Sequence, residues 1–146
     1  MDDNETRCDL LFVYGTLRHG CDNEKARTLT KMAEWLCTAR TDGQLWNVDW
    51  YPALTKNTGR GDSVLGDVFR LTDPQTGLAM LDTYEECTAD FPQPWEYRRE
   101  IITVEGPNGS LRVWAYLYNR PVEGLDIIEG GDWLSHIARA PVRRPA

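Results

Sequence analysis

Leu10-Leu11-Phe12-Val13-Tyr14-Gly15-Thr16-Leu17-Arg18 is the stretch on which the predicted fold and the predicted site both depend. Its first four residues are continuously apolar and end in β-favouring Phe12 and Val13, which predicts a short buried strand. Gly15 has access to backbone angles closed to other residues and lets a ligand approach the main chain. The amides of residues 15–17 can then face one concavity, a nest suited to an anion or a developing oxyanion. The same residues are equally compatible with an ordinary strand-ending turn.

Length, composition and charge narrow the class of protein. The chain has 146 residues, 41% hydrophobic and 27% charged, which is typical of one globular domain over 1–146 and not of a disordered chain. The net charge of −7 repels a phosphate backbone, so we expect no nucleic-acid partner. No apolar run approaches the ~20 residues that span a bilayer, and we expect no membrane partner. The acidic start lacks the basic and apolar parts of a signal peptide, so we expect a cytoplasmic protein.

The cysteines and histidines give little support for a metal site. The sequence contains four cysteines: Cys8, Cys21, Cys37 and Cys87. None forms a C-x-x-C pair, and only two histidines are present, so we expect no metal ion and interpret the cysteines as free thiols. A thiol hydrolase built on Cys21 and His19 is an alternative hypothesis, although no known nucleophile signature surrounds them.

Capping residues mark two helices. The spacing of apolar residues predicts a short helix over 22–33, with Asp22 or Asn23 as its N-cap. A second helix is predicted over 74–84, because Asp73 stands at the capping position and a proline follows at the first helical position.

A hairpin is the strongest β-signal. Two alternating segments, 97–104 and 111–118, flank Gly106-Pro107-Asn108-Gly109, which favours a tight turn. The second segment places its aromatic side chains on one face, an arrangement more typical of a core than of a site: Trp114, Tyr116 and Tyr118.

The remaining segments are assigned from alternation and turn chemistry. A strand is predicted over 63–71, in which Gly66 allows a bulge or a close backbone approach. Pro52 restricts the segment 51–54 to an edge strand or a loop. Composition assigns the rest: a strand within 36–46, a turn at 57–62, a loop at 87–95, a last helical turn at 133–138 and a loose tail at 142–146.

Three carboxylates gather at the C-terminal end of the predicted 74–84 helix: Asp82, Glu85 and Glu86. The helix dipole and the neighbouring like charges both disfavour ionisation there, which predicts a raised pKa for one of them. A carboxylate of that kind suits a general base near pH 7. A solvated acidic helix end is the competing interpretation.

Five short motifs occur in a characteristic order: Tyr14-Gly15-Thr16-Leu17-Arg18, Tyr51-Pro52-Ala53-Leu54, Leu81-Asp82-x-x-Glu85, Tyr97-x-Arg99 and Trp114-Ala115-Tyr116-x-Tyr118. The series resembles the γ-glutamylcyclotransferase-like family, which includes the γ-glutamylamine cyclotransferases and the AIG2-like proteins. The resemblance covers roughly residues 10–119. It implies a compact α+β fold with a mixed, barrel-like β-sheet and a few short helices.

The resemblance also implies the reaction and the site. The α-amine of a γ-glutamyl group attacks its own side-chain carbonyl and releases 5-oxoproline and a free amine, with no cofactor. The substrate-binding loop of the family corresponds to Tyr14, Gly15, Thr16 and Leu17, and its catalytic glutamate corresponds to Glu85. The family commonly has glycine at the next position, where this chain has Glu86 and then Cys87-Thr88-Ala89-Asp90.

Two further residues are assigned from the pattern itself. Tyr118 is interpreted either as a hydrogen-bond donor to the substrate or as a core residue, and Arg99 as the structural partner of a carboxylate. The changed segment after Glu85 keeps a second hypothesis open, in which the same fold binds a small molecule without chemistry. The sequence leaves the amine half of the substrate and the oligomeric state undetermined.

Overall fold

The computed structural model describes residues 8–48, 51–56 and 62–139. The strands are β1 (Leu10–Val13), β2 (Ala33–Val48), β3 (Tyr51–Lys56), β4 (Ser63–Leu71), β5 (Tyr97–Gly106), β6 (Gly109–Tyr118) and β7 (Asp126–Ile127). The helices are α2 (Glu24–Met32), α3 (Pro74–Tyr84), the short 3-10 turn η1 (Glu129–Gly131) and α4 (Trp133–Arg139). The predicted turn at 57–62 and the tail at 142–146 fall wholly or largely outside the described residues.

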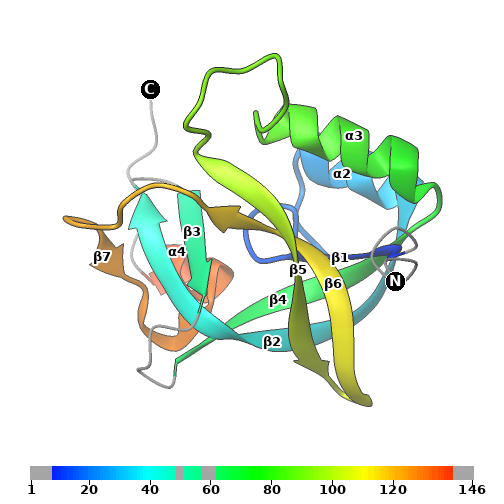
Figure 1. Cartoon of the computed structure of the whole chain (residues 1–146). Coiled ribbons are helices and arrows are strands. Elements are labelled where there is room, and N and C mark those ends of the chain that lie inside the picture. The colour runs from blue at the N-terminus through cyan, green and yellow to red at the C-terminus, as the bar shows by residue number, and fades with distance from the viewer. Residues whose placement is uncertain (1–7, 49–50, 57–61, 140–146) are drawn as a thin grey trace.

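A closed, mixed β-barrel organises the molecule (Figure 1). Neighbouring strands follow the order β2-β4-β1-β6-β5, and β5 returns to β2 through the pair Arg40 and Glu105. β1 runs antiparallel to β4 but parallel to β6, with Leu11 opposite Trp114. Closure pairs strands that would otherwise present open edges. The predicted α+β fold with a mixed barrel-like sheet and few helices is confirmed.

β2 is longer than predicted. Instead of a strand confined to 36–46, one strand runs over 16 residues from the barrel into an extension that pairs with β3 and β7. Its register shifts between Trp35 and Cys37, and its two ends pack against different neighbours. No single alternation therefore runs along the segment, and this concealed its length. β3 lies at the end of the strand order, which confirms the edge position expected from Pro52.

The helices begin where their capping residues predict. Asn23, rather than Asp22, caps α2, because its side chain accepts a hydrogen bond from the Ala26 amide at 2.8 Å. Asp73 caps α3, whose predicted bounds are confirmed. α2 ends at Met32 because the next residue already pairs with Leu71 in the barrel. α4 continues one residue beyond the predicted 133–138. None of the helices in the described part of the chain is long and apolar enough to cross a membrane.

Alternate residues of β1 belong to two different apolar clusters. Phe12 packs with Val68, Val104 and other residues of the barrel interior. Leu11 and Val13 face the opposite way and join a cluster that includes Leu residues of α2 and α3. In Figure 1 these two helices lie side by side over the end of the barrel where β1 lies. Because successive side chains of a strand point to opposite faces, β1 packs against the barrel interior on one side and against the helices on the other.

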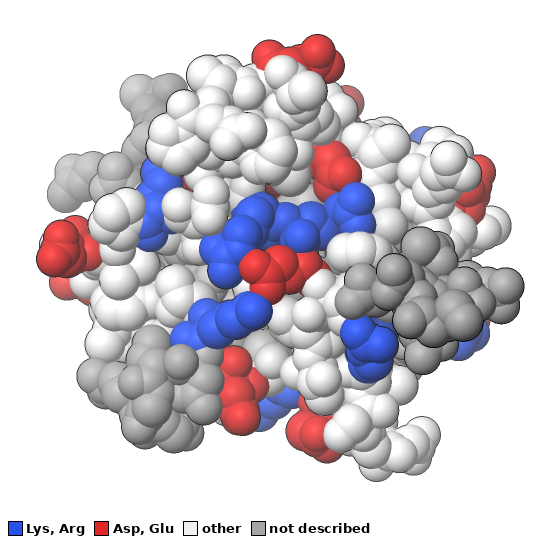
Figure 2. Space-filling view, viewed as in Figure 1, with Lys and Arg blue, Asp and Glu red and all other residues white. Residues whose placement is uncertain are grey.

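The hairpin and its aromatic face are confirmed. β5 and β6 pair from Tyr97 opposite Tyr118 to Gly106 opposite Gly109, so both strands extend two residues closer to the turn than predicted. On the other face of the hairpin, the partly exposed Glu100 of β5 forms ion pairs with Arg98 and with Lys56 of β3. Figure 2, viewed as in Figure 1, shows Lys and Arg side chains gathered around acidic ones in the middle of the side of the molecule that faces the viewer.

We predict that Gly66→Ala destabilises the fold while Gly77→Ala does not. A Cβ at Gly66 would lie 2.4 Å from the Val13 carbonyl oxygen, a backbone atom that has little room to move. We expect a loss of roughly 1–3 kcal/mol in the free energy of unfolding, measured by urea denaturation. At Gly77 in α3 the nearest atom would be a Leu71 methyl at 3.4 Å, so alanine should be neutral or stabilising by about 0.5–1 kcal/mol. Equal stability of the two variants would contradict the close approach of β1 and β4.

Candidate active site

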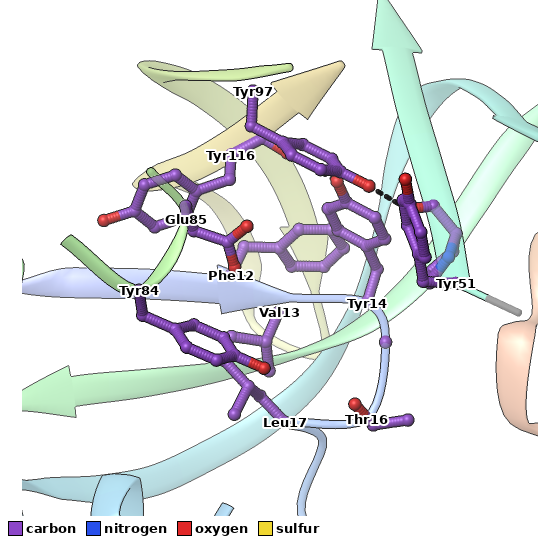
Figure 3. Close-up of a pocket in the computed structure, with 12 residues that line it drawn as sticks. Phe12, Val13, Tyr14, Thr16, Leu17, Tyr51, Tyr84, Glu85, Tyr97 and Tyr116 are labelled. Carbon is purple, nitrogen blue, oxygen red and sulfur yellow. Dashed lines mark hydrogen bonds between the residues drawn. The ribbon is translucent and has the colours of Figure 1, made fainter. Parts of the chain in front are cut away.

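A cavity of about 500 Å³ opens between the end of β1, the end of α3 and the edge strand β3. Figure 3 shows the Glu85 carboxylate pointing into it among aromatic rings that come from different elements. The lining comprises Phe12, Val13, Tyr14, Gly15, Thr16, Leu17, Tyr51, Pro52, Tyr84, Glu85, Tyr97 and Tyr116. The structure therefore brings together the two segments singled out from the sequence, the 14–17 loop and Glu85.

The loop that follows β1 is anchored at both ends. The hydroxyl of Tyr14 donates to the main-chain carbonyl of Tyr116 on β6. At the other end, Arg18 Nε donates to Asp67 Oδ2 at 2.9 Å and Nη1 to Asp132 Oδ1 at 3.2 Å. The Arg18 side chain is only 11% exposed, so these charge-assisted bonds are largely shielded from water.

Asp67 is the centre of this anchoring. Asp67 is 3% exposed, and its carboxylate accepts three bonds besides that from Arg18. The donors are the His19 amide at 3.0 Å, Trp35 Nε1 at 3.1 Å and Thr38 Oγ1 at 3.2 Å. Sequence reasoning missed this role, although an acidic residue inside an otherwise apolar strand was the available signal. The loop is consequently held in one conformation by a fully bonded buried carboxylate.

The loop keeps its amides available, although Gly15 does not use its conformational freedom. Gly15 has no left-handed φ; its lack of a side chain matters because a Cβ would lie 3.1 Å from Pro52 Cγ. Asn23 Nδ2 holds the Thr16 carbonyl at 2.8 Å. Within the described residues, no hydrogen bond is found from the N–H groups of residues 15–17, so these donors remain open to a ligand.

The end of α3 is fixed to the barrel by Asp82. Arg99 donates to this carboxylate twice, from Nε at 2.8 Å and from Nη2 at 3.1 Å, and the Tyr116 hydroxyl adds a third bond at 2.7 Å. The Arg99 guanidinium also lies over the Trp114 ring at 4.2 Å. The predicted structural role of Arg99 is confirmed, and it assigns Asp82 to the framework rather than to the cavity.

The last turn of α3 presents Glu85 at the helix C-cap. The Glu86 amide donates to the Thr83 carbonyl and the Cys87 amide to that of Asp82, which is the Schellman arrangement. Glu86 stands at the position that usually takes glycine in this motif, and its φ is 59°. Its side chain is exposed and does not line the main cavity. Glu86 therefore keeps the backbone path expected of glycine but with a conformational cost.

Glu85 has the electrostatics of an acid–base group. Burial, followed by the nearby carboxylates of Glu96 and Glu86, raises its pKa to about 7. The direction agrees with the prediction, but the main cause does not: desolvation outweighs the neighbouring charges, and Glu96 comes from a distant segment. No hydrogen bond to the Glu85 carboxylate is found among the described residues, in contrast to Asp82.

Four of the tyrosines that line the cavity donate their hydroxyls to main-chain or carboxylate acceptors: Tyr14, Tyr51, Tyr97 and Tyr116. Tyr97 donates to the Pro52 carbonyl at 2.7 Å, and Tyr51 donates to Glu96. Burial is the largest cause that raises the pKa of both hydroxyls, which therefore stay neutral. Tyr118 is not among the lining residues; its ring packs edge-on against Tyr97 at 5.6 Å. Sequence reasoning did not single out Tyr51, Tyr84 or Tyr97 as cavity residues, because no pattern along one strand reveals which elements converge.

The alternative pair Cys21 and His19 lacks the properties of a nucleophile and its base. Burial raises the pKa of the Cys21 thiol, whereas a nucleophilic cysteine needs it lowered. The His19 ring stacks on Trp35 with centroids 4.4 Å apart. All four cysteines are free thiols. Over the described ranges, no three His, Cys, Asp or Glu side chains are grouped to hold a metal ion.

Comparison with known proteins identifies relatives over most of the chain. Residues 11–135 match the family model described as "Gamma-glutamyl cyclotransferase, AIG2-like". The γ-glutamylcyclotransferase family protein YtfP of Escherichia coli K12 is 34% identical over 131 residues, covering 85% of this chain and 95% of YtfP. γ-Glutamylaminecyclotransferase A of Danio rerio is 36% identical over 114 residues, covering 74% and 69% of the two chains.

Solved structures show the same fold. YkqA from Bacillus subtilis superimposes with a TM-score of 0.69 at 27% identity, over 94% of this chain and 44% of that one. An AIG2-like protein from Mus musculus gives a TM-score of 0.65 at 25% identity, over 83% and 86% of the two chains.

We predict that Glu86→Gly stabilises the protein. Glycine adopts a left-handed φ without the steric cost of roughly 1–2 kcal/mol that an L side chain carries, so we expect a gain of about 1 kcal/mol in the free energy of unfolding. Glu86→Ala is the matched control, because it removes the same charge but keeps the Cβ. Thermal and urea unfolding should place the alanine variant near the parent protein. A gain of equal size in both variants would assign the effect to charge instead of backbone conformation.

Proposed function

Because the chain belongs to the AIG2-like γ-glutamyl cyclotransferase family, we propose that it cyclises a γ-glutamyl group to 5-oxoproline and releases a free amine. Glu85 is the acid–base residue in this proposal, and the 14–17 loop binds the γ-glutamyl moiety. The observation that carries it is the Glu85 carboxylate, with a pKa of about 7, in the cavity that residues 15–17 also line; the N–H groups of these residues have no hydrogen-bond acceptor within the described part of the chain.

The first step is removal of a proton from the substrate. An α-ammonium group is not a nucleophile until it loses a proton, and ionised Glu85 is a suitable acceptor because its pKa lies near neutrality. The tyrosine and phenylalanine rings around it exclude water and keep this pKa raised.

The second step closes the ring. The freed α-amine attacks the side-chain carbonyl carbon, and the developing oxyanion is stabilised by N–H groups of the 15–17 loop. The C–N bond to the amine half then breaks. The lactam nitrogen keeps one of the three original ammonium protons, and Glu85 relays the other two to the departing amine. Since the reaction is intramolecular, orientation supplies much of the acceleration, with effective molarities on the order of 10⁵ M or more.

We predict that Glu85→Gln abolishes most of the turnover. The amide cannot accept the ammonium proton, so kcat should fall by roughly 10²–10⁴-fold. The measurement is 5-oxoproline release from a panel of γ-glutamyl amines and dipeptides. Glu129→Gln, which changes an exposed carboxylate in η1, is the matched control and should keep full activity. Unchanged turnover in the Glu85 variant would contradict its role, whereas tight binding without product from any substrate would favour a non-catalytic binding protein.

The stability of the same variant reports whether it is folded. The folded-state pKa of about 7 lies above the ordinary value of 4.5, so between these values the unfolded chain releases its proton first and native stability falls as pH rises. Above pH 7 the whole loss of stability caused by ionising the buried Glu85 carboxyl remains. Glu85→Gln removes it, and its thermal midpoint at pH 8 should therefore equal or exceed that of the parent protein.

The pH dependence of turnover gives an independent prediction. The ionised fraction of Glu85 falls roughly tenfold per pH unit below its pKa, so kcat/KM should decline below about pH 7. Glu86→Ala removes one of the charges that raise this pKa, and it should shift the acidic limb of the profile to lower pH. An acidic limb centred near 4.5 in the parent protein would contradict the environment described for Glu85.

A further inference from the structure

A second cavity lies on the other side of Glu85. It measures about 200 Å³ and shares Tyr84, Glu85 and Tyr97 with the main cavity, so these three residues form the boundary between the two spaces. Its outer walls come from the segment between α3 and β5, which includes Phe91 and Trp95. This segment contains the Cys87–Asp90 stretch that departs from the family pattern.

The chemistry of the main cavity determines what this space can hold. If the proposed function is correct, Glu85 exchanges protons first with the α-amine and then with the departing nitrogen, so both atoms lie close to its carboxylate. The γ-glutamyl half occupies the side that carries the 15–17 amides. The amine half must therefore extend past Glu85 in another direction, and the second cavity is the adjoining space that this carboxylate also lines.

The apolar groove between α2 and α3 is a poorer candidate for the amine half. It meets the main cavity at Leu17 and Tyr84, but Glu85 is not among its lining residues. A nitrogen bound there would have no contact with the proposed proton donor.

The lining of the second cavity is acidic even when Glu85 is not counted. Glu86 and Glu96 line it, and of its described lining residues only Arg120 is a cation. The Arg120 guanidinium already donates to the Pro94 carbonyl at 3.3 Å. Glu96 is held in position by the Tyr51 hydroxyl, which donates to its Oε2; no hydrogen bond to its Oε1 is found over the described ranges. Aromatic faces such as that of Trp95 add a favourable surface for a cation.

We propose that this second cavity is the binding site for the amine half, and that Glu96 with Glu86 selects amines that carry a further positive charge. Resting on the proposed function, the inference adds the class of leaving group: an alkyl chain that ends in an ammonium group. A leaving group that ends in a carboxylate is repelled by the same two glutamates.

Three substrates of matched length test the charge preference. They are the γ-glutamyl amides of 1,4-diaminobutane, of pentylamine and of 5-aminopentanoate, in which the same four methylenes carry a terminal ammonium, methyl or carboxylate group. We expect kcat/KM to fall in that order, with the ammonium compound roughly threefold to tenfold above the methyl compound, the size expected of a partly screened charge pair. Equal or reversed values for the ammonium and methyl compounds would overturn the proposal.

Variants assign the preference to this cavity. Glu96→Gln keeps an acceptor for Tyr51 but removes the charge, and the double variant with Glu86→Gln removes both charges; the ammonium-to-methyl ratio should approach one. Taking the ratio cancels the change in the pKa of Glu85 that these variants also cause. Glu129→Gln is the control and should preserve the ratio. A ratio unchanged in the double variant would overturn the assignment.

A binding measurement separates failure of this inference from failure of the proposed function. Calorimetric titration of the Glu85→Gln protein with the same three compounds should give the same order of affinity, whether or not the parent protein turns them over. Absence of 5-oxoproline from every compound would count against the proposed reaction, while equal affinities for the ammonium and methyl compounds would count against the cationic subsite.

Discussion

The bidentate pair between Asp82 and Arg99 is the constraint on which the site depends. It fastens the C-terminal end of α3 to β5, and the Tyr116 hydroxyl extends the bond to β6. Both charged side chains are mostly buried, so removing one partner would leave the other in an unfavourable environment. Because the helix end is fixed in this way, the residue three positions later is held at the cavity rather than in solvent.

Two acids three residues apart consequently have opposite roles. Asp82 receives hydrogen bonds from Arg99, Tyr116 and the Cys87 thiol and belongs to the framework. Glu85 turns toward aromatic rings without a hydrogen bond from the described residues. The same desolvation that disfavours its charge raises its pKa to about 7. Asp67 acts like Asp82 on the opposite wall, where it fixes Arg18 and with it the loop. The hydrogen-bonded carboxylates of Asp82 and Asp67 thus hold the framework in place around the Glu85 carboxylate, which has the raised pKa.

Much of this arrangement was predictable from the sequence. Glycines and capping residues set the bounds of β1, β4 and α3, because turns and helix ends are decided by local backbone chemistry. The length of β2 was not predictable, since its two halves satisfy different neighbours. The hydrogen bond from the Tyr14 hydroxyl to the Tyr116 carbonyl was also not predictable. The two residues lie about a hundred positions apart in the sequence, so no local pattern connects them.

The sequence by itself predicted the class of fold, the loop after β1 and Glu85 as the proposed base, because five motifs in a fixed order carry the resemblance to the family. The local chemistry of the residues alone pointed only to one of three carboxylates: Asp82, Glu85 or Glu86. Only the tertiary structure decided which acid is paired and which has no partner among the described residues, because burial and hydrogen bonding depend on elements that meet in space. Glu96 illustrates the difference. It comes from the segment before β5, yet it raises the pKa of Glu85 and lines the second cavity. The spacing of the two residues in the sequence does not predict that they lie close together.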